Sequence, residues 1–512
     1  MSRSSTRKSR QPILIAVMPV VMLFLLFPFR QTKIARQLEN VTLDWRFEAR
    51  AQSDPPADER ILVVGIGEDS LERFGRWPWN RDIHAALLQV AKKREPAVVA
   101  FDLFFPEESQ DPDHDLAFQQ MLELYPNAVT GAVAEAQAEP YTRDSIGKTG
   151  PFSRVTGDIE SLVGGPNGLV PIDPVAQAAW TGFVNSDPSE VDGMRWFTPL
   201  VVRLGDSVYP SLALQILMRL ENVTPDRVEV ELGEAIRFYD ENGKVTREIP
   251  TNLKGEIRLN YRSFDGFTVA DYSQLVVALN ELPDSGEGWP ADYPPITDQV
   301  LIVGQTAVGL SDFGSTPLLP NTPLVLVQAT VLNSLLKGDY LESVSPVPIM
   351  VFWLALTWIT LALLRNAPVT IGVSVPILLA GLYVVAGFYL FTNSNIRIPL
   401  FLPTASFLGL HMAAVTARLY RENRMKSRIK GMFGTYVSPE VVHEMVSAED
   451  PPRLGGEECE ITALFSDIQG FSTFSEELDA PKLVQLLNEY LGPLTDILTY
   501  NGGTLDKYIG DA

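Results

Sequence analysis

The chain has 512 residues, enough for about three domains, and hydrophobic residues make up 46% of it. Its net charge of −22 at pH 7 excludes a nucleic acid as the main partner, because contacts to phosphates need a basic surface. The single cysteine, Cys459, excludes an intrachain disulfide, so the polar regions must be stabilised by their apolar cores.

The chain begins with a basic segment, residues 1–10, and an apolar run follows from Pro12 to Phe29. As a helix this run is roughly 27 Å long, which is close to the thickness of a bilayer core. We predict an uncleaved transmembrane helix over 11–29, with residues 1–10 in the cytoplasm because basic flanks stay inside. A cleaved signal peptide is the alternative, but Phe24–Phe29 offers no small-residue cleavage site.

Residues 30–346 are polar and acidic, and their pattern predicts an α/β domain. Ile61–Gly67 and Ala97–Phe105 are apolar runs typical of buried strands, and Arg81–Lys93 has the periodicity of a helix between them. Gly65 and Gly67 give a G-x-G pattern without the third glycine of a dinucleotide turn, so we interpret them as the end of a strand.

Two patches of this region could bind a ligand, and each has a structural alternative. The acidic group Asp111, Asp113, His114 and Asp115 could hold a cation, or it could cap a helix after a proline-containing loop. The two tryptophans beside Pro78, Trp77 and Trp79, could form an aromatic pocket or pack a loop onto the core.

Several short motifs stand out in this region. They are R-W-P-W-N-R-D from Arg76, A-F-D-L-F-F-P from Ala100, G-F-V-N-S-D-P, V-Y-P-S-L-A-L from Val208, L-N-Y-R from Leu259 and V-G-Q-T-A-V-G-L-S-D from Val303. These motifs resemble the CHASE2 family of extracytoplasmic sensor domains. The resemblance covers nearly all of residues 31 to 340 and implies a sensor with an unknown extracytoplasmic ligand, without assigning a role to any residue.

Three apolar blocks follow, and we predict transmembrane helices over residues 347–364, 368–391 and 399–417. With the first helix they make four crossings, which place both chain ends on one side. Six basic residues follow the last block between 418 and 430, as expected at the start of a cytoplasmic linker, which we predict over 418–456. The expected location is therefore the cell (inner) membrane, with residues 30–346 outside.

The last segment, 457–512, contains the residues that point to chemistry. Ile461–Phe465 is typical of a buried strand, which would present Asp467 at its end, and Gly470 permits a tight turn whose free N–H groups suit a phosphate. Thr504–Ile509 predicts a second strand that presents Asp511 on a hairpin tip. Two such carboxylates can hold a pair of divalent metal ions.

The sequences F-S-D-I-Q-G-F-S and G-G-T-L-D-K-Y-I-G-D-A resemble the first part of a class III nucleotidyl cyclase domain. The resemblance implies an α+β ferredoxin-like fold and two Mg²⁺ or Mn²⁺ ions. It implies that Asp467 and Asp511 hold the metals, with the Ile468 carbonyl as a further ligand. It also implies that N–H groups of three residues hold the triphosphate, namely Gly470, Phe471 and Ser472.

In this family the position of Lys507 reads the purine. An ammonium is a donor only, so it suits the acceptor N1 of adenine rather than the N1–H of guanine. The resemblance therefore implies ATP as the substrate, conversion to 3′,5′-cyclic AMP and pyrophosphate, and an obligatory homodimer whose sites are shared between chains.

The resemblance also implies over a hundred further residues after the second aspartate, including the transition-state Asn/Arg pair, so we expect residues 457–512 alone to be inactive. Guanylate cyclase is an alternative that Lys507 disfavours. Diguanylate cyclase is disfavoured because Gly502-Gly503 is followed by Thr-Leu-Asp. A receptor with a degenerate, non-catalytic cyclase domain is the alternative from another class of protein.

Overall fold

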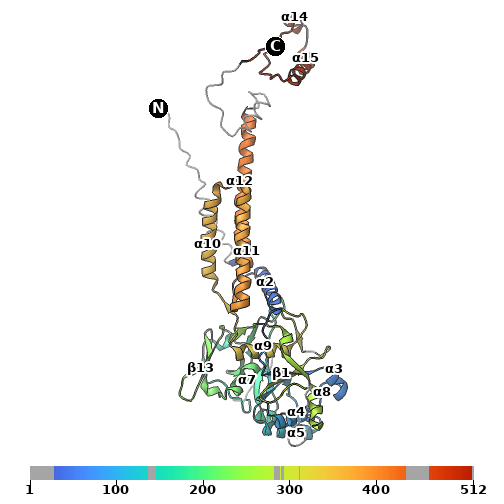
Figure 1. Cartoon of the computed structure of the whole chain (residues 1–512), viewed down its shortest axis with the longest axis vertical. Helices are drawn as coiled ribbons and strands as arrows, with labels where there is room; N and C mark the ends of the chain where they lie inside the picture. The colour runs from blue at the N-terminus through green and yellow to red at the C-terminus, as the bar shows by residue number, and fades with distance from the viewer. Residues whose placement is uncertain are drawn as a thin grey trace. The chain divides into compact units, whose positions relative to one another are not determined.

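The computed structural model describes residues 28–135, 146–281, 289, 293–310, 312–433 and 460–509 (Figure 1). The chain divides into two units, of which the first comprises Met1–Ala362 and Val375–Leu408. The second comprises Leu363–Ser374 and Gly409–Ala512.

A mostly parallel sheet forms the centre of the first unit. Its order is β15-β1-β16-β2-β3, with β7 parallel and β6 antiparallel to β3. The strands β1 and β2 lie where the sequence predicts them and are buried along nearly their whole length, because helices cover both faces. The strands are β1 (Ile61–Ile66), β2 (Val98–Phe104), β3 (Ala128–Glu135), β6 (Asn167–Leu169), β7 (Trp180–Phe183), β15 (Thr268–Asp271) and β16 (Val300–Gln305).

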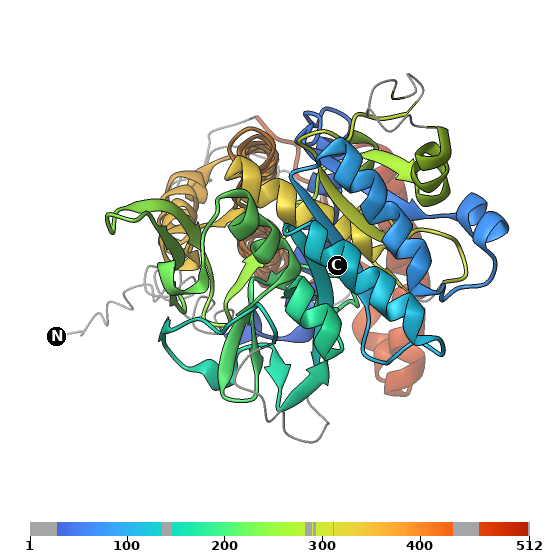
Figure 2. The ribbon, with the colours of Figure 1, turned by 90° about the horizontal axis from the view of Figure 1, so that it is seen from below.

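Each face of the sheet has its own apolar core. Ile61 and Val63 belong to the core on one face, whereas Leu62 and Val64 belong to the other, as the alternation of strand side chains requires. Two helices cover the first face, α7 (Leu212–Leu220) and α9 (Leu324–Lys337). Three cover the second, α4 (Arg81–Arg94), α5 (Pro112–Leu124) and α8 (Tyr272–Glu281), and Figure 2 shows the two groups on opposite sides of the strands.

Short elements complete the domain. Four strands form a sheet in the order β13-β12-β11-β4, three form β10-β9-β5, and three further pairs are β14-β8, β17-β18 and β19-β20. The strands are β4 (Arg154–Thr156), β5 (Gly164–Gly165), β8 (Phe197–Pro199), β9 (Val201–Leu204), β10 (Ser207–Pro210), β11 (Val228–Glu231), β12 (Ala235–Tyr239), β13 (Val245–Pro250), β14 (Glu256–Arg258), β17 (Phe313–Gly314), β18 (Thr322–Pro323), β19 (Glu342–Ser343) and β20 (Ile396–Arg397). The short helices are α3 (Glu68–Phe74) and α6 (Asp173–Ala178).

The helix α2 (Lys33–Ala51) leads into this domain. Its N-cap is Thr32, whose hydroxyl accepts the N–H of Ala35 at 3.3 Å. One face of α2 is buried, with Leu43 and Phe47 in the core beside the domain's helices. The predicted transmembrane helix that would precede α2, residues 11–29, lies almost entirely outside the described residues.

Three long helices follow the domain, α10 (Pro346–Leu363), α11 (Val369–Ser394) and α12 (Phe401–Phe433). Among the described residues, the two helical stretches Pro346–Asn366 and Val369–Ser394 are long and apolar enough to cross a membrane, which agrees with the predicted spans 347–364 and 368–391. The span predicted over 399–417 lies at the start of α12. This helix is long enough to cross a membrane, but its mean hydropathy is lower than that of the other two. Several Ser and Thr residues, together with His411, lower the mean hydropathy of that part.

The first turns of α12 nevertheless share an apolar cluster with α10 and α11. The ring of Trp353 lies 4.7 Å from that of Phe407 and 4.8 Å from that of Tyr383, measured between centroids. The helix then continues without a break through the basic residues to Phe433, so the predicted helical extension of this segment is present.

The described part of the second unit beyond α12 contains α14 (Phe471–Ser475) and α15 (Ala480–Tyr500). The strands predicted over Ile461–Phe465 and Thr504–Ile509 are not formed there, and the α+β ferredoxin-like fold is not shown. A strand needs a neighbour that pairs with its backbone, and these segments have none among the described residues. Their apolar side chains are exposed as a result, with Phe465 89% exposed.

Candidate functional site

Asp467 and Gly470 precede α14, and the other residues of the proposed phosphate cradle, Phe471 and Ser472, begin that helix. The N–H of Phe471 donates to the carbonyl of Ile468 at 3.1 Å, and Gly470 adopts a φ of +75°. Side chains rarely tolerate this left-handed conformation, so the turn needs a glycine, as the sequence predicts. The carbonyl of Ser472 accepts the hydroxyl of Ser475 at 3.1 Å.

The opposite half of the predicted site is described only in part. Lys507 is exposed and precedes Tyr508, whose hydroxyl bonds that of Thr495 on α15. Asp511 lies outside the described residues. The structure therefore places Asp467 and Lys507 but does not show the two aspartates of the predicted metal site together.

The donor atoms that are described suit the implied metal. The Asp467 carboxylate and the Ile468 carbonyl are hard oxygen ligands of the kind that Mg²⁺ prefers. No group of three or more metal-ligating side chains occurs in the described part of the chain, and Mg²⁺ usually needs only one or two carboxylates beside phosphate oxygens.

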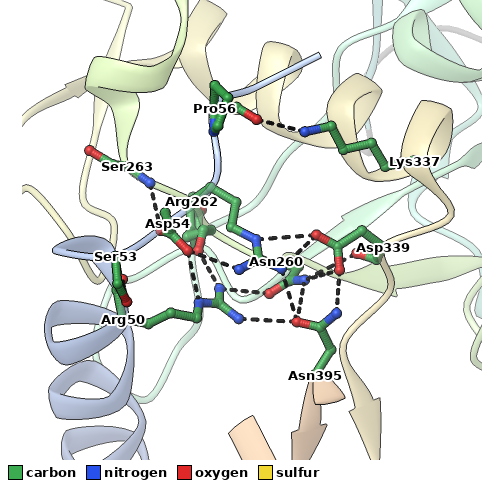
Figure 3. Close-up of polar contacts among 11 residues, drawn as sticks. Arg50, Ser53, Asp54, Pro56, Asn260, Arg262, Ser263, Lys337, Asp339 and Asn395 are labelled. Atoms are coloured by element: carbon green, nitrogen blue, oxygen red, sulfur yellow. Dashed lines mark hydrogen bonds and ion pairs between the residues drawn. The ribbon is translucent and has the colours of Figure 1, made fainter. Parts of the chain in front are cut away.

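A buried polar cluster joins the domain to the ends of the long helices, and Figure 3 shows its contacts. We call it the polar junction. Its side chains come from α2, from the segments after α2 and β14, from the segment after α9, and from the loop between α11 and α12. They are Arg50, Asp54, Asn260, Arg262, Asp339 and Asn395.

Arg50 is the most deeply buried cation of the polar junction, with 1% of its side chain exposed. Its Nη2 donates to Asn260 Oδ1 at 2.8 Å, and its Nη1 donates to Asn395 Oδ1 at 3.3 Å. Burial, and then the charge of Arg262, lowers the pKa of Arg50 to about 10. The guanidinium therefore stays charged at neutral pH, and its contacts hold α2 to the loop after α11.

Arg262 bridges two carboxylates in the polar junction. Its Nη1 donates to Asp54 Oδ1 at 2.8 Å, and its Nη2 donates to Asp339 Oδ2 at 2.7 Å. Burial acts to lower the pKa of Arg262, but these hydrogen bonds outweigh it and raise the pKa. Asp339 also accepts a hydrogen bond from the amide of Asn395, so the charged pair reaches the loop between α11 and α12.

A second group of contacts fixes the start of α12. The Glu39 carboxylate of α2 accepts the N–H groups of Leu400 at 2.9 Å and Phe401 at 3.0 Å. Free N–H groups and the helix dipole make the start of a helix a favourable place for a carboxylate. Arg46, whose side chain is fully buried, donates to the Ile398 carbonyl at 3.0 Å, so α2 holds α12 at two points.

The loops before α10 and before α12 are also paired directly. The strand β19 (Glu342–Ser343) is parallel to β20 (Ile396–Arg397). Together with the polar junction, this pairing connects α2, the entry to α10 and the α11–α12 loop through hydrogen bonds and charges. A rearrangement of the domain that shifts any of these segments must therefore move the helix ends or break buried contacts.

The sequence gives only a faint signal of the polar junction. Asn260 and Arg262 lie in the L-N-Y-R motif, but no role could be assigned to them. The partners of Arg262 are far away in the sequence, at Asp54 and Asp339, and only the fold brings them together.

The two patches considered as ligand sites have structural roles. Asp111 caps α5 by accepting the N–H of Asp113 at 3.0 Å, and Asp115 pairs with Arg81 at 2.5 Å. Trp79 is 8% exposed, and its ring centroid lies 5.2 Å from that of Trp77. The capping and packing interpretations are therefore confirmed.

Asp44 on α2 should make the stability of the domain depend on pH. Burial, with the charges of Asp192 and Glu48, raises its pKa from 3.8 to about 7. The folded state then holds a proton that the unfolded state releases, so the stabilisation is complete below pH 3.8 and is lost as the pH rises through about 7. We expect the unfolding temperature of the full-length protein to fall over this range.

The variant Asp44→Asn is the matched control, because it keeps the shape of the side chain and removes the titration. The fall in unfolding temperature between pH 4 and 7 should be smaller in this variant. An unchanged pH profile would show that the carboxyl of Asp44 titrates near its usual pKa.

Comparison with known proteins gives one family and several relatives. A model of the CHASE2 domain matches residues 20–365. An uncharacterized protein of Mycobacterium bovis is 30% identical over 95 residues, which cover 19% of this chain and 16% of the relative. An uncharacterized protein of Mycobacterium tuberculosis is 25% identical over 252 residues, 49% of this chain and 43% of the relative. The chain thus spans less than half the length of these relatives, and no solved structure matches it significantly.

Proposed function

This chain belongs to the CHASE2 family, whose domain is an extracellular sensor of signalling proteins, and from this we propose that it is a membrane receptor with an adenylate cyclase as its output. The sensor domain would face the outside, and α10, α11 and the start of α12 would cross the cell membrane with a first helix over residues 11–29. The observation that carries the catalytic part is the paired motif around Asp467 and Lys507.

The charge pattern supports this orientation. The end of α12 carries six arginines and lysines between residues 418 and 430, and basic residues beside a membrane helix favour the cytoplasmic side. ATP is cytoplasmic, so the same orientation that satisfies the charges gives residues 457–512 access to the substrate.

The proposed reaction is attack of the ATP ribose 3′-oxygen on the α-phosphorus, which forms the cyclic ester and releases pyrophosphate. Asp467, the Ile468 carbonyl and Asp511 would hold two Mg²⁺ or Mn²⁺ ions, which acidify the attacking hydroxyl and neutralise phosphate charge when bound. The N–H groups around Gly470, Phe471 and Ser472 would orient the triphosphate, and two copies of the chain would form the complete sites.

Lys507 would select the base by donating to adenine N1. We expect Lys507→Glu to lower cyclic AMP formation and to shift the relative rate toward GTP, because a carboxylate accepts from guanine N1–H. The loss of such a base contact costs about 1–3 kcal/mol, or roughly 5- to 160-fold in kcat/KM. The measurement is the rate of each cyclic nucleotide formed by the full-length protein.

Lys482→Glu is the matched control for this charge reversal, because Lys482 is exposed near the start of α15 and pairs weakly with Asp479 at 3.8 Å. It should leave the preference for ATP unchanged. Equal effects of the two substitutions would remove Lys507 from the purine site. Activity on GTP alone in the unmodified protein would indicate a guanylate cyclase instead.

A further inference from the structure

The outer face of α2 carries four large apolar side chains in a line. Ile34 is 63% exposed, Leu38 38%, Val41 37% and Trp45 58%. A helix on the surface of a domain normally has polar residues on its outer face. This stripe is therefore an apolar surface that the chain itself leaves uncovered in the described structure.

The stripe lies opposite the face with which α2 packs on its own domain. At 100° per residue, the four side chains fall within about 60° of one another around the helix. Leu43 and Phe47, both buried in the core, lie on the other side of α2. The folding of the domain thus uses one apolar face of α2, and no described residue covers the second one.

The spacing of the stripe favours another helix as its occupant. The four residues are separated by four, three and four positions, which is the heptad pattern of a two-helix seam. The positions beside the stripe are Gln37, Thr42, Asp44 and Ala49, and Glu48 follows Trp45 along it. A helix that lies on an anionic lipid surface has arginines and lysines beside its apolar face, and this stripe has none there.

We propose that the stripe docks against the same stripe of a second copy of this chain, with the two α2 helices parallel. The two copies would enter the domain from one membrane in the same orientation, which fixes the parallel arrangement. In the parallel register Gln37 would face Thr42 and Asp44 would face Ala49 of the other copy, so no like charges face each other there. Glu48, the next seam position after Trp45, would meet the same residue of the other copy, so the favourable seam ends at Trp45.

The size of the stripe implies that the membrane anchors contribute to the dimer. A stable interface between soluble proteins buries about 800 Å² on each partner, and four side chains offer less. Two chains confined to one bilayer have a high effective concentration, so a small seam suffices. The inference goes beyond the proposed catalytic function and holds whatever the cytoplasmic output is.

Disulfide crosslinking of the full-length protein in membranes tests this contact. In a background with Cys459→Ser, Leu38→Cys and Val41→Cys should each form covalent dimers on mild oxidation, because equivalent seam positions come within the Cα separation of about 4.4–6.8 Å that a disulfide requires. Arg36→Cys is the control, since Arg36 is exposed but lies away from the stripe. It should remain monomeric under the same oxidation.

A second variant distinguishes crosslinking through the proposed seam from crosslinking through random collisions in the membrane. Adding Trp45→Glu to Leu38→Cys should reduce the yield of covalent dimer at least severalfold, while the unfolding temperature changes little because Trp45 is 58% exposed. Equal crosslinking at all three cysteine positions, or crosslinking only at Arg36→Cys, would overturn the proposal. An absence of crosslinking at both stripe positions would also overturn it and would leave lipid as the cover of this face.

Discussion

Replacing Asp467 by alanine in the full-length protein is expected to abolish cyclic AMP formation. Substitution of a group that hydrogen-bonds a metal ligand typically lowers metal affinity or activity about 10- to 100-fold. The loss of a ligand itself should therefore lower the activity at least about 100-fold. Asp467 lies in an exposed segment without helix or strand. Its removal should therefore leave the unfolding temperature of the protein unchanged.

Asp496→Ala is the matched control, because Asp496 is an exposed aspartate on α15 that no motif of the predicted site includes. Its activity should stay within about twofold of the unmodified protein, since an exposed helix position tolerates alanine. Comparable activity of the Asp467 variant and the control would exclude Asp467 as a metal ligand.

Arg262→Ala should destabilise the domain more than any other substitution considered. It removes the nearest cation from two carboxylates, Asp54 with 2% and Asp339 with 15% of the side chain exposed, and leaves Asp54 only its longer ion pair with Arg50 at 3.4 Å. Removing one partner of a buried ion pair costs about 3–5 kcal/mol, because the remaining charge has lost its compensation. Denaturant unfolding followed by tryptophan fluorescence measures this loss in free energy.

Arg237→Ala is the control with the same number of partners in a different environment. Arg237 also pairs with two carboxylates, those of Glu231 and Glu248, which are 43% and 56% exposed. Such surface pairs contribute at most about 1 kcal/mol each. Similar losses in the two variants would mean that water compensates the carboxylates of the polar junction.

Arg262→Lys tests the geometry of the polar junction separately from its charge. A lysine keeps the positive charge but cannot bind Asp54 and Asp339 through separate nitrogens of a planar fork. We expect a stability between those of Arg262→Ala and the unmodified protein.

The strands and helices of the sensor domain were predictable where one local pattern dominates. The apolar runs that became β1 and β2 are buried on both faces, and α4 follows the periodicity of residues 81–94. The order of the strands was not predictable. β16 lies between β1 and β2 although about 200 residues separate it from them in the sequence, and such pairing depends on the whole fold.

The polar junction and the predicted catalytic segment show two different limits of sequence reasoning. Arg50 contacts Asn395, and Arg262 contacts Asp339, only in the folded domain. Because these partners are far apart in the sequence, no spacing of residues along the chain predicts the contacts. The run Ile461–Phe465 has the composition of a buried strand, but composition does not supply the neighbouring strand that pairing needs.

The identity of the product tests the central claim most directly. The full-length protein, in lipid nanodiscs with Mn²⁺, would be supplied with equal concentrations of ATP and GTP, and the cyclic nucleotides would be separated by chromatography. The account predicts cyclic AMP as the main product, with one pyrophosphate released for each molecule. The account is contradicted if the protein forms neither cyclic nucleotide although it unfolds cooperatively and crosslinks through Val41→Cys. That result would indicate a sensor without a catalytic output.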